Sequence, residues 1–137
     1  MMTAEPLILC VDDDAQYLRS LARSLTGRGY RVKSCTSASQ ALEAARADRP
    51  ALAIVDVLMP GMDGLQLTAR LAHWEGGPIP VVLHTGYASE ETFFQGFFEG
   101  ARYVVEKPCG PEKLLDVVDY FAGDLGEEER RVLKERL

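Results

Sequence analysis

Apolar and polar positions along the chain alternate between two patterns. Short segments that are apolar at nearly every position are separated by longer segments in which apolar residues return every three or four positions. The first pattern is typical of strands buried on both faces of a sheet, and the second of amphipathic helices packed on it. We therefore expect buried strands at 7–11, 51–56, 79–84 and 102–106, and a more alternating edge strand at 30–35.

The segments between these strands carry signals for helix starts and ends. Ser37 followed by Gln40 predicts a capping box, Ser89 a cap, and Pro111 the first position of a helix. Glycine and proline residues mark the ends. We expect one helix that includes residues 18–25 and a second from residue 38 up to Pro50. Three more are expected at 65–74, 90–99 and 111–122. Strands that alternate with helices predict one α/β domain with a parallel sheet and crossover helices.

Composition and charge narrow the function classes. The 137 residues are 47% hydrophobic, which suits one globular domain with a substantial core. A net charge of −6 and a sequence pI near 4.9 disfavour contact with nucleic acid or an anionic membrane. With no apolar run of membrane-spanning length and no basic, signal-like start, we expect a cytoplasmic protein. Cys10, Cys35 and Cys109 have no metal-ligand spacing and are interpreted as packed thiols.

Chemically active residues follow four of the expected strands. Asp12 and Asp13 follow the first, Asp56 ends the third, Thr85 follows the fourth and Lys107 the fifth. Since open α/β sheets bind ligands at the carboxyl ends of their strands, these side chains are expected to lie together. Three neighbouring carboxylates repel one another unless a divalent cation lies among them. All-oxygen ligands favour Mg²⁺, with Mn²⁺ as the alternative.

On these residues the chain resembles the receiver domains of two-component response regulators, of the chemotaxis-regulator type. The resemblance covers residues 7–122 and rests on Val-Asp-Asp after the first strand, the D-x-x-x-P-G-M-D-G stretch from Asp56, Thr85-Gly86 and Lys107-Pro108. It implies a doubly wound, flavodoxin-like sheet of five strands in the order 2-1-3-4-5. It also implies a phosphoacceptor regulatory domain at 1–122, not an enzyme, with at most slow self-catalysed phosphotransfer and autodephosphorylation.

The resemblance also implies a role for each residue of the site. Asp56 is expected to be the phosphoacceptor, and Thr85 and Lys107 to contact the phosphoryl group. The implied ligands of Mg²⁺ are Asp12, Asp13, Asp56 and the backbone carbonyl of Leu58. A histidine kinase or a histidine phosphotransfer protein is the implied donor, and phosphorylation would switch conformation and partner binding.

Four further polar residues have structural interpretations. Asp14 is expected to cap a helix, and Asp63 to be a turn or cap residue, both in preference to binding metal. His73 is expected to be exposed at the end of a helix. His84 has no metal-ligand partner in spacing and is interpreted as a packed histidine of the fourth strand.

Two features near the site depart from the family pattern. The residue three before Lys107, where many receivers carry a tyrosine or phenylalanine that reports on the threonine, is Val104. Tyr87, just after the fourth strand, is a candidate for covering the phosphorylation site instead. Together with Leu58, it is expected to slow attack by water and lengthen the phosphorylated lifetime.

A phenylalanine-rich segment follows the fourth strand. Phe93 with Phe97 and Phe94 with Phe98 form two i,i+4 pairs that make an apolar stripe on the expected helix. One pair is expected to face the sheet, and the other either packs against neighbouring helices or forms an exposed surface for a partner. Gly96 lowers the intrinsic stability of this helix by about 1 kcal/mol relative to alanine, which a helix that rearranges would tolerate.

After residue 122 the composition becomes strongly charged. Glu127 and Arg131 can pair at i,i+4, beside a thin apolar seam. We interpret 123–137 as a charged C-terminal helical extension, either solvated or the start of a linker to an output domain. A homodimer and an output-domain partner both remain open.

Two alternatives to a phosphoacceptor also remain. A pseudo-receiver would bind its partner without phosphorylation, and the complete set of strand-end acids, hydroxyl and lysine argues against it. An aspartate-nucleophile phosphatase on a similar sheet commonly has a second aspartate two residues after the nucleophile, where this chain has Leu58.

Overall fold

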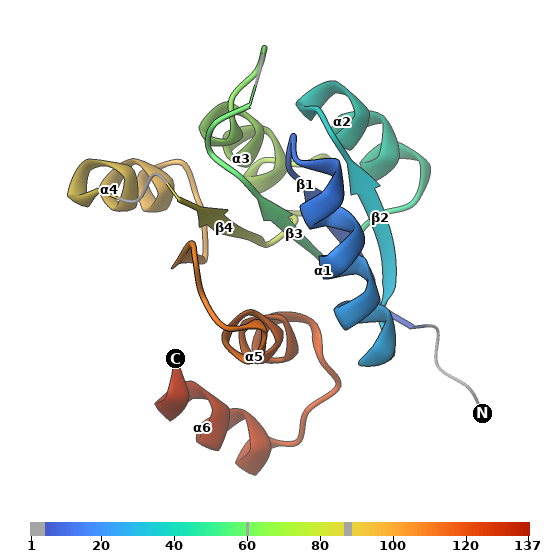
Figure 1. The fold of residues 1–137 in the computed structure, drawn as a ribbon, viewed down its shortest axis with the longest axis vertical. Coiled ribbons are helices and arrows are strands. Elements are labelled where there is room, and N and C mark those ends of the chain that lie inside the picture. Colours follow the sequence, from blue (N-terminus) through green and yellow to red (C-terminus); the bar gives the residue numbers. More distant parts are fainter. Residues whose placement is uncertain (1–4, 60, 87–88) are drawn as a thin grey trace.

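The computed structural model describes residues 5–59, 61–86 and 89–137. In this part of the chain, five parallel strands form one sheet in the order β2-β1-β3-β4-β5 (Figure 1). The strands are β1 (Leu7–Val11), β2 (Arg31–Cys35), β3 (Leu52–Val55), β4 (Val81–Thr85) and β5 (Tyr103–Glu106). The helices are α1 (Ala15–Gly27), α2 (Ala38–Ala47), α3 (Gly64–Ala72), α4 (Glu90–Phe98), α5 (Pro111–Ala122) and α6 (Glu127–Arg136). The predicted α/β fold and strand order are confirmed.

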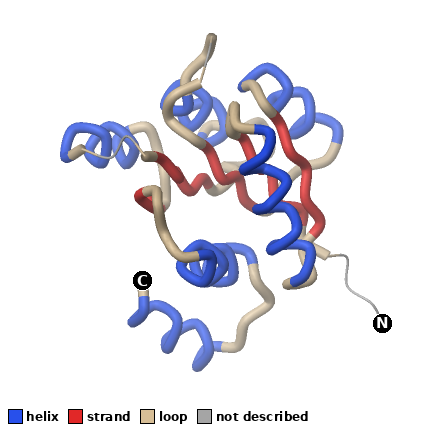
Figure 2. The backbone as a smooth tube through the Cα atoms, viewed as in Figure 1, coloured by secondary structure: helices blue, strands red, loops and turns tan. Residues whose placement is uncertain are grey.

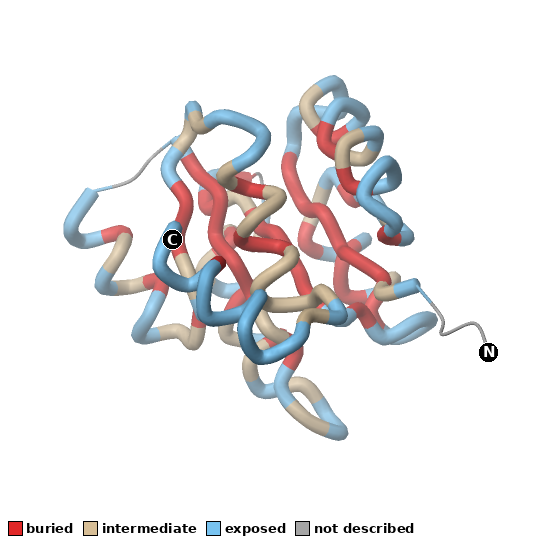
Figure 3. The backbone as a smooth tube through the Cα atoms, turned by 90° about the horizontal axis from the view of Figure 1, so that it is seen from below, coloured by how far each residue is buried: buried red, intermediate tan, exposed pale blue. Residues whose placement is uncertain are grey.

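Helices cover both faces of the sheet, as Figure 2 shows with strands in red and helices in blue. On one face, Leu18 of α1 and Leu114 of α5 join the core. On the other, α2 and α3 pack with residues such as Leu42 and Leu67, and Phe93 of α4 adds to the same cluster. In Figure 3 the buried central strands lie between helices whose outer sides are exposed. β2 exposes most of its side chains, as predicted for the edge strand.

α2 ends earlier than predicted. Its last residue is Ala47, and Asp48 is already extended, with φ −152°. Arg49 precedes Pro50, and a proline ring disfavours helical backbone at the residue before it. The helix therefore cannot continue up to Pro50.

The predicted capping box of α2 is only half formed. Ser37 Oγ accepts the Gln40 backbone N–H at 3.2 Å, but the Gln40 side chain accepts the N–H of Thr36 instead of the N–H of Ser37. A complete box occurs at α3. There Asp63 accepts the backbone N–H of Gln66 at 2.8 Å, and the Gln66 side chain accepts that of Asp63 at 3.1 Å. The interpretation of Asp63 as a cap is confirmed.

α4 faces the sheet with small residues, so the prediction of a sheet-facing phenylalanine pair is wrong. The buried positions of α4 are Thr92 and Gly96. A Cβ on Gly96 would lie 2.6 Å from Leu83 Cδ1, so the helix backbone approaches β4 too closely for a larger side chain at that position. Only Phe93 is half-buried against the core. The exposed fractions of the others are 66% for Phe94, 49% for Phe97 and 75% for Phe98.

α6 packs against α5 instead of standing free in solvent (Figure 1). Leu133 is its buried residue, and Arg136 binds Asp116 of α5 with N···O 2.8 Å. Among the described helices, none combines the length and apolar character that crossing a membrane requires.

The predicted pairing of Glu127 with Arg131 on α6 is replaced by two other ion pairs. Arg131 binds Glu128 through Nε and Nη2, and Glu135 through Nη1. The contact with Glu128 is bidentate, because two N–H groups of the guanidinium bind the two oxygens of one carboxylate. A contact through a single donor lacks this match in geometry. All of these groups are exposed, so they contribute little to stability.

Candidate functional site

The carboxyl ends of β1 and β3 bring three aspartates together. The backbone N–H of Asp12 donates to Cys35 of β2, and that of Asp56 to Val11 of β1, so each residue is fixed where its strand ends. One carboxylate oxygen from each of Asp12, Asp13 and Asp56 lies within 4.8 Å of the other two. The cluster predicted from the strand ends is therefore present.

Lys107 and Thr85 lie beside these acids. Lys107 Nζ is 2.6 Å from Asp12 Oδ2 and 3.7 Å from Asp56 Oδ2. Thr85 is buried at the end of β4, close enough to Asp56 for its side chain to lower the pKa of that carboxyl. All five strand-end residues singled out in the sequence thus meet at one edge of the sheet.

The charges of the site are not balanced by the protein alone. Three carboxylates and one ammonium leave an excess of two negative charges, and burial raises the pKa of Asp56. Lys107 and the neighbouring Thr85 side chain oppose this increase in the pKa, whereas Asp12 adds to it. A divalent cation would remove the excess charge, and oxygen donors in such a cluster suit a hard ion. The acidic residues therefore fit a metal site.

The surrounding backbone orients the first acid. Asp12 Oδ1 accepts the N–H of Asp14 at 3.0 Å. Asp14 turns away from the cluster and caps α1 by accepting the N–H groups of Gln16 and Tyr17, both at 3.1 Å. The interpretation of Asp14 as a cap is confirmed.

Of the residues expected to modulate the site, Leu58 and Val104 belong to the part of the chain that the structure describes. The Leu58 side chain is 55% exposed, and the metal-binding role of its carbonyl stays a prediction. Val104 is buried, close to the position that a Cβ on Gly96 would occupy. Tyr87 lies outside the described residues.

The two histidines differ as expected. His73 is exposed at the end of α3. His84 is buried, with Nδ1 2.8 Å from the Tyr17 hydroxyl and Nε2 3.5 Å from Cys109 Sγ. Burial lowers the pKa of His84 to about 4, and the positive charge of Lys107 contributes to this shift.

Sequence reasoning missed Tyr17, whose ring lies next to the Lys107 ammonium. The available signal was its place in the first turn of the helix that follows the acidic pair. Of the cysteines, Cys10 and Cys35 are buried thiols as predicted, and Cys109 is half-buried.

The sequence matches the response regulator receiver domain family over residues 8–119. It is 31% identical over 134 residues to the C4-dicarboxylate transport transcriptional regulatory protein DctD of Rhizobium meliloti, an alignment that covers 98% of this chain and 28% of that protein. The chain spans between 28% and 47% of the length of the first curated relatives that it matches.

Solved structures of the same kind share the fold. The chemotaxis protein CheY4 of Vibrio cholerae superimposes with a TM-score of 0.79 at 27% identity, over 86% of this chain and 99% of that one. A response regulator from Burkholderia pseudomallei, solved with a phosphorylated aspartic acid, a calcium ion and citrate, has a TM-score of 0.76 at 30% identity. The superposition covers 96% of this chain and 73% of that one. With the strand order, the acidic cluster and the family match in agreement, this chain belongs to the response regulator receiver domains.

Proposed function

We propose that Asp56 accepts a phosphoryl group from a phosphohistidine donor. The observation that carries the proposal is the convergence at one sheet edge of three carboxylates with oxygens within 4.8 Å, with Lys107 and Thr85 both in contact with Asp56 or close to it. As a receiver domain, the chain is a phosphoacceptor and not an enzyme of the classical kind.

The proposed metal is Mg²⁺, or Mn²⁺ in its place. Its ligands would be Asp12, Asp13, Asp56 and the backbone carbonyl of Leu58. When bound, the ion supplies neutralisation of charge on the acids and on the incoming phosphate. The excess negative charge of the cluster supports this choice.

The transfer itself exchanges one bond to phosphorus for another. A carboxylate oxygen of Asp56 attacks the phosphorus atom, and the P–N bond to the donor imidazole breaks. The imidazole leaves with the bonding electron pair, and the product on Asp56 is a mixed anhydride of the carboxylate and phosphate. Lys107 offers an ammonium to the phosphoryl oxygens, and the hydroxyl of Thr85, which lies beside Asp56, can donate a hydrogen bond to one of them.

The donor class is a histidine kinase or a histidine phosphotransfer protein, in the cytoplasm. The conformational change is proposed to act on a partner, which would be an output domain or a second copy of the chain. Residues 1–122 form the receiver in this proposal, and 123–137 an extension toward such a partner. The alternative is a pseudo-receiver that works without phosphorylation. It would require that a complete set of site residues is present but that Asp56 is never phosphorylated.

Intact-mass measurement after incubation with acetyl phosphate and Mg²⁺ tests the proposal. We expect one phosphoryl adduct on the wild type and none on Asp56→Asn. Asp63→Asn is the matched control, because it changes an aspartate that caps α3 outside the cluster, and it should still be loaded. A wild-type protein that gains no adduct would favour the pseudo-receiver.

A further inference from the structure

The Lys107 ammonium has an aromatic neighbour in addition to its two carboxylates. Lys107 Nζ lies 4.5 Å from the centroid of the Tyr17 ring, within the range of a cation–π contact. The Lys107 side chain is only 24% exposed. Such a contact is stronger where the cation is partly removed from water. Tyr17 therefore helps to determine where the ammonium is held.

The Tyr17 ring is anchored by its hydroxyl. That hydroxyl lies 2.8 Å from His84 Nδ1, and the two ring centroids are 5.5 Å apart. His84 is 3% exposed on β4, and its other ring nitrogen faces Cys109 Sγ at 3.5 Å. Because both nitrogens of the buried imidazole have neighbours, the ring offers Tyr17 a fixed partner.

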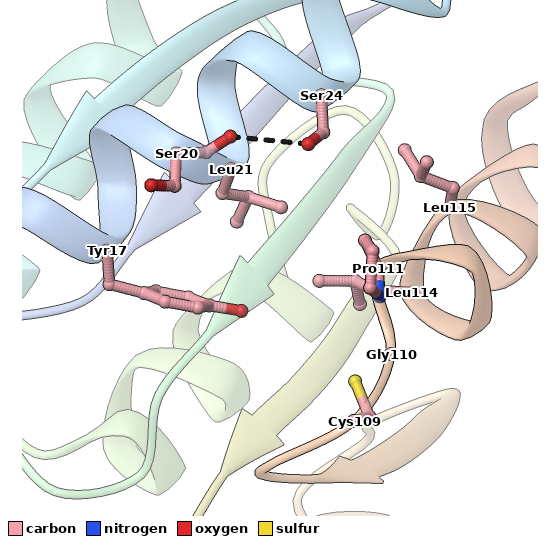
Figure 4. A pocket seen from close by; sticks show the side chains of 9 residues that line it. All are labelled: Tyr17, Ser20, Leu21, Ser24, Cys109, Gly110, Pro111, Leu114 and Leu115. Carbon is pink, nitrogen blue, oxygen red and sulfur yellow. Dashed lines mark hydrogen bonds between the residues drawn. The ribbon is translucent and has the colours of Figure 1, made fainter.

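Packing does not hold the Tyr17 ring on every side. Tyr17 and Cys109 border a cavity of about 200 Å³ between α1 and α5, which Leu21 and Leu114 also line (Figure 4). A ring with open space beside it can turn unless a directional contact restrains it. The hydrogen bond to His84 is that contact.

We propose that Tyr17, anchored through its hydroxyl by His84, is a positioning residue that directs the Lys107 ammonium toward the phosphoryl group on Asp56. The inference rests on the proposed phosphorylation of Asp56. It extends that proposal to α1 and to a residue outside the five strand-end residues of the site.

The physical reason is that Asp12 is a shared partner. In the structure, Asp12 is the nearest carboxylate to Lys107, at 2.6 Å, and it is also one of the three acids that suit a cation. A cation bound by the Asp12 carboxylate would weaken the attraction between that carboxylate and the Lys107 ammonium. The contact with the Tyr17 ring does not depend on that carboxylate, so it keeps Lys107 near Asp56, which is 3.7 Å away.

Nuclear magnetic resonance on the unphosphorylated, metal-free protein tests the contact. Side-chain protons of Lys107 next to an aromatic ring should resonate upfield of those of the other lysines. We expect this shift to disappear in Tyr17→Leu and to decrease in Tyr17→Phe, which keeps the ring but loses the anchor. Tyr120→Leu is the matched control. It removes the ring of Tyr120 on α5, which Arg130 contacts, and leaves Tyr17 in place.

Rates of phosphorylation by acetyl phosphate test the positioning role. Tyr17→Leu should slow loading by about three- to tenfold, as expected for loss of one cation–π contact. In a Lys107→Ala background, the same change should have almost no effect, since the group that it positions is gone. Tyr17→Phe and His84→Leu should not add to one another, because both break the same hydrogen bond.

The outcomes separate this inference from the proposed function. Equal slowing by Tyr17→Leu with and without Lys107 would mean a general structural effect and would overturn the inference, as would unchanged Lys107 resonances in Tyr17→Leu. If the wild type cannot be loaded, or Asp56→Asn still can, the proposed function fails and the positioning role with it. The resonance shift would still report the contact between Tyr17 and Lys107.

Discussion

Gly64, the first residue of α3, packs against the backbone carbonyl of Asp56. A Cβ on Gly64 would lie 2.0 Å from that carbonyl oxygen, far inside any normal contact. The Gly64 N–H also donates to the Val57 carbonyl at 2.8 Å. The start of α3 is thus in direct backbone contact with the two residues that follow β3, which fixes the segment at the candidate phosphoacceptor.

Substitution of this glycine should disturb both stability and the site. Gly64→Ala forces backbone apart, since the clashing atoms belong to the main chain and cannot rotate away. We expect a loss of at least about 1–3 kcal/mol in the free energy of unfolding, typical of overpacking, and weaker Mg²⁺ binding. Denaturant unfolding and metal titration measure the two effects.

Gly110→Ala is the control for this prediction. Gly110 also lies at a helix start, before α5, but a Cβ there would meet no atom within 4 Å. Its substitution should leave unfolding and metal binding nearly unchanged. Equal effects at both glycines would show that the close approach to Asp56 is not what matters.

Lys107→Ala should separate metal binding from the response to phosphorylation. The change removes a cation 2.6 Å from Asp12 without removing a proposed ligand, so Mg²⁺ should still bind and raise the melting temperature. Phosphorylation should then produce a smaller conformational change than in the wild type. Loss of Mg²⁺ binding in a titration would contradict the role given to Lys107.

His84 should make stability depend on pH. The unfolded imidazole takes up a proton near pH 6.5, whereas burial lowers the pKa of the folded one to about 4. The unfolded state therefore binds more protons between these values, and the free energy of unfolding decreases as the pH falls through this range. For this one group we expect a decrease of about 1–2 kcal/mol from pH 7 to pH 5.

Urea unfolding of His84→Leu at the two pH values checks this prediction. The variant loses the hydrogen bond to Tyr17 at both pH values, so the quantity to compare is the pH dependence of the free energy of unfolding and not its absolute value. This pH dependence should be weaker in His84→Leu than in the wild type. His73→Gln, at the exposed histidine, should retain the wild-type dependence. If the free energy of unfolding of His84→Leu depended on pH as steeply as that of the wild type, other groups would be responsible for the pH dependence.

α4 is expected to respond to phosphorylation. Only groups that bind the phosphoryl group differently in two states can shift the domain, and Thr85 and Lys107 flank the chain segment that contains α4. Because Gly96 packs closely on Leu83, we expect a movement of β4 to displace the backbone of α4. Hydrogen exchange with and without beryllofluoride, a phosphoryl mimic, should differ most between Thr85 and Lys107. Differences confined to the acidic cluster would rule out this route.

The strand pattern predicted most of the fold and site because both depend on topology. Parallel strands that end in Asp12, Asp56, Thr85 and Lys107 must bring these residues to one edge, whatever the details of packing. The phenylalanines of α4 show the limit. Their spacing defines a stripe but does not say which side of the helix meets the sheet, and it is Thr92 and Gly96 that α4 buries there.

Tyr17 and His84 could not be connected from sequence. They are 67 positions apart, and their hydrogen bond depends on side-chain orientations at the junction of α1 and β4. The end of α2, in contrast, could have been placed before Arg49 from the sequence, because the restriction before proline is local, although we expected the helix to continue up to Pro50.

Chemical localisation of the phosphoryl group shows whether Asp56 is the residue that carries it. Borohydride reduces an acyl phosphate to an alcohol and converts a phosphorylated aspartate to homoserine, which peptide mass spectrometry can place in the sequence. After phosphorylation with acetyl phosphate and Mg²⁺, we expect homoserine at Asp56 alone. Homoserine at Asp12 or Asp13, with Asp56 unmodified, would contradict this expectation.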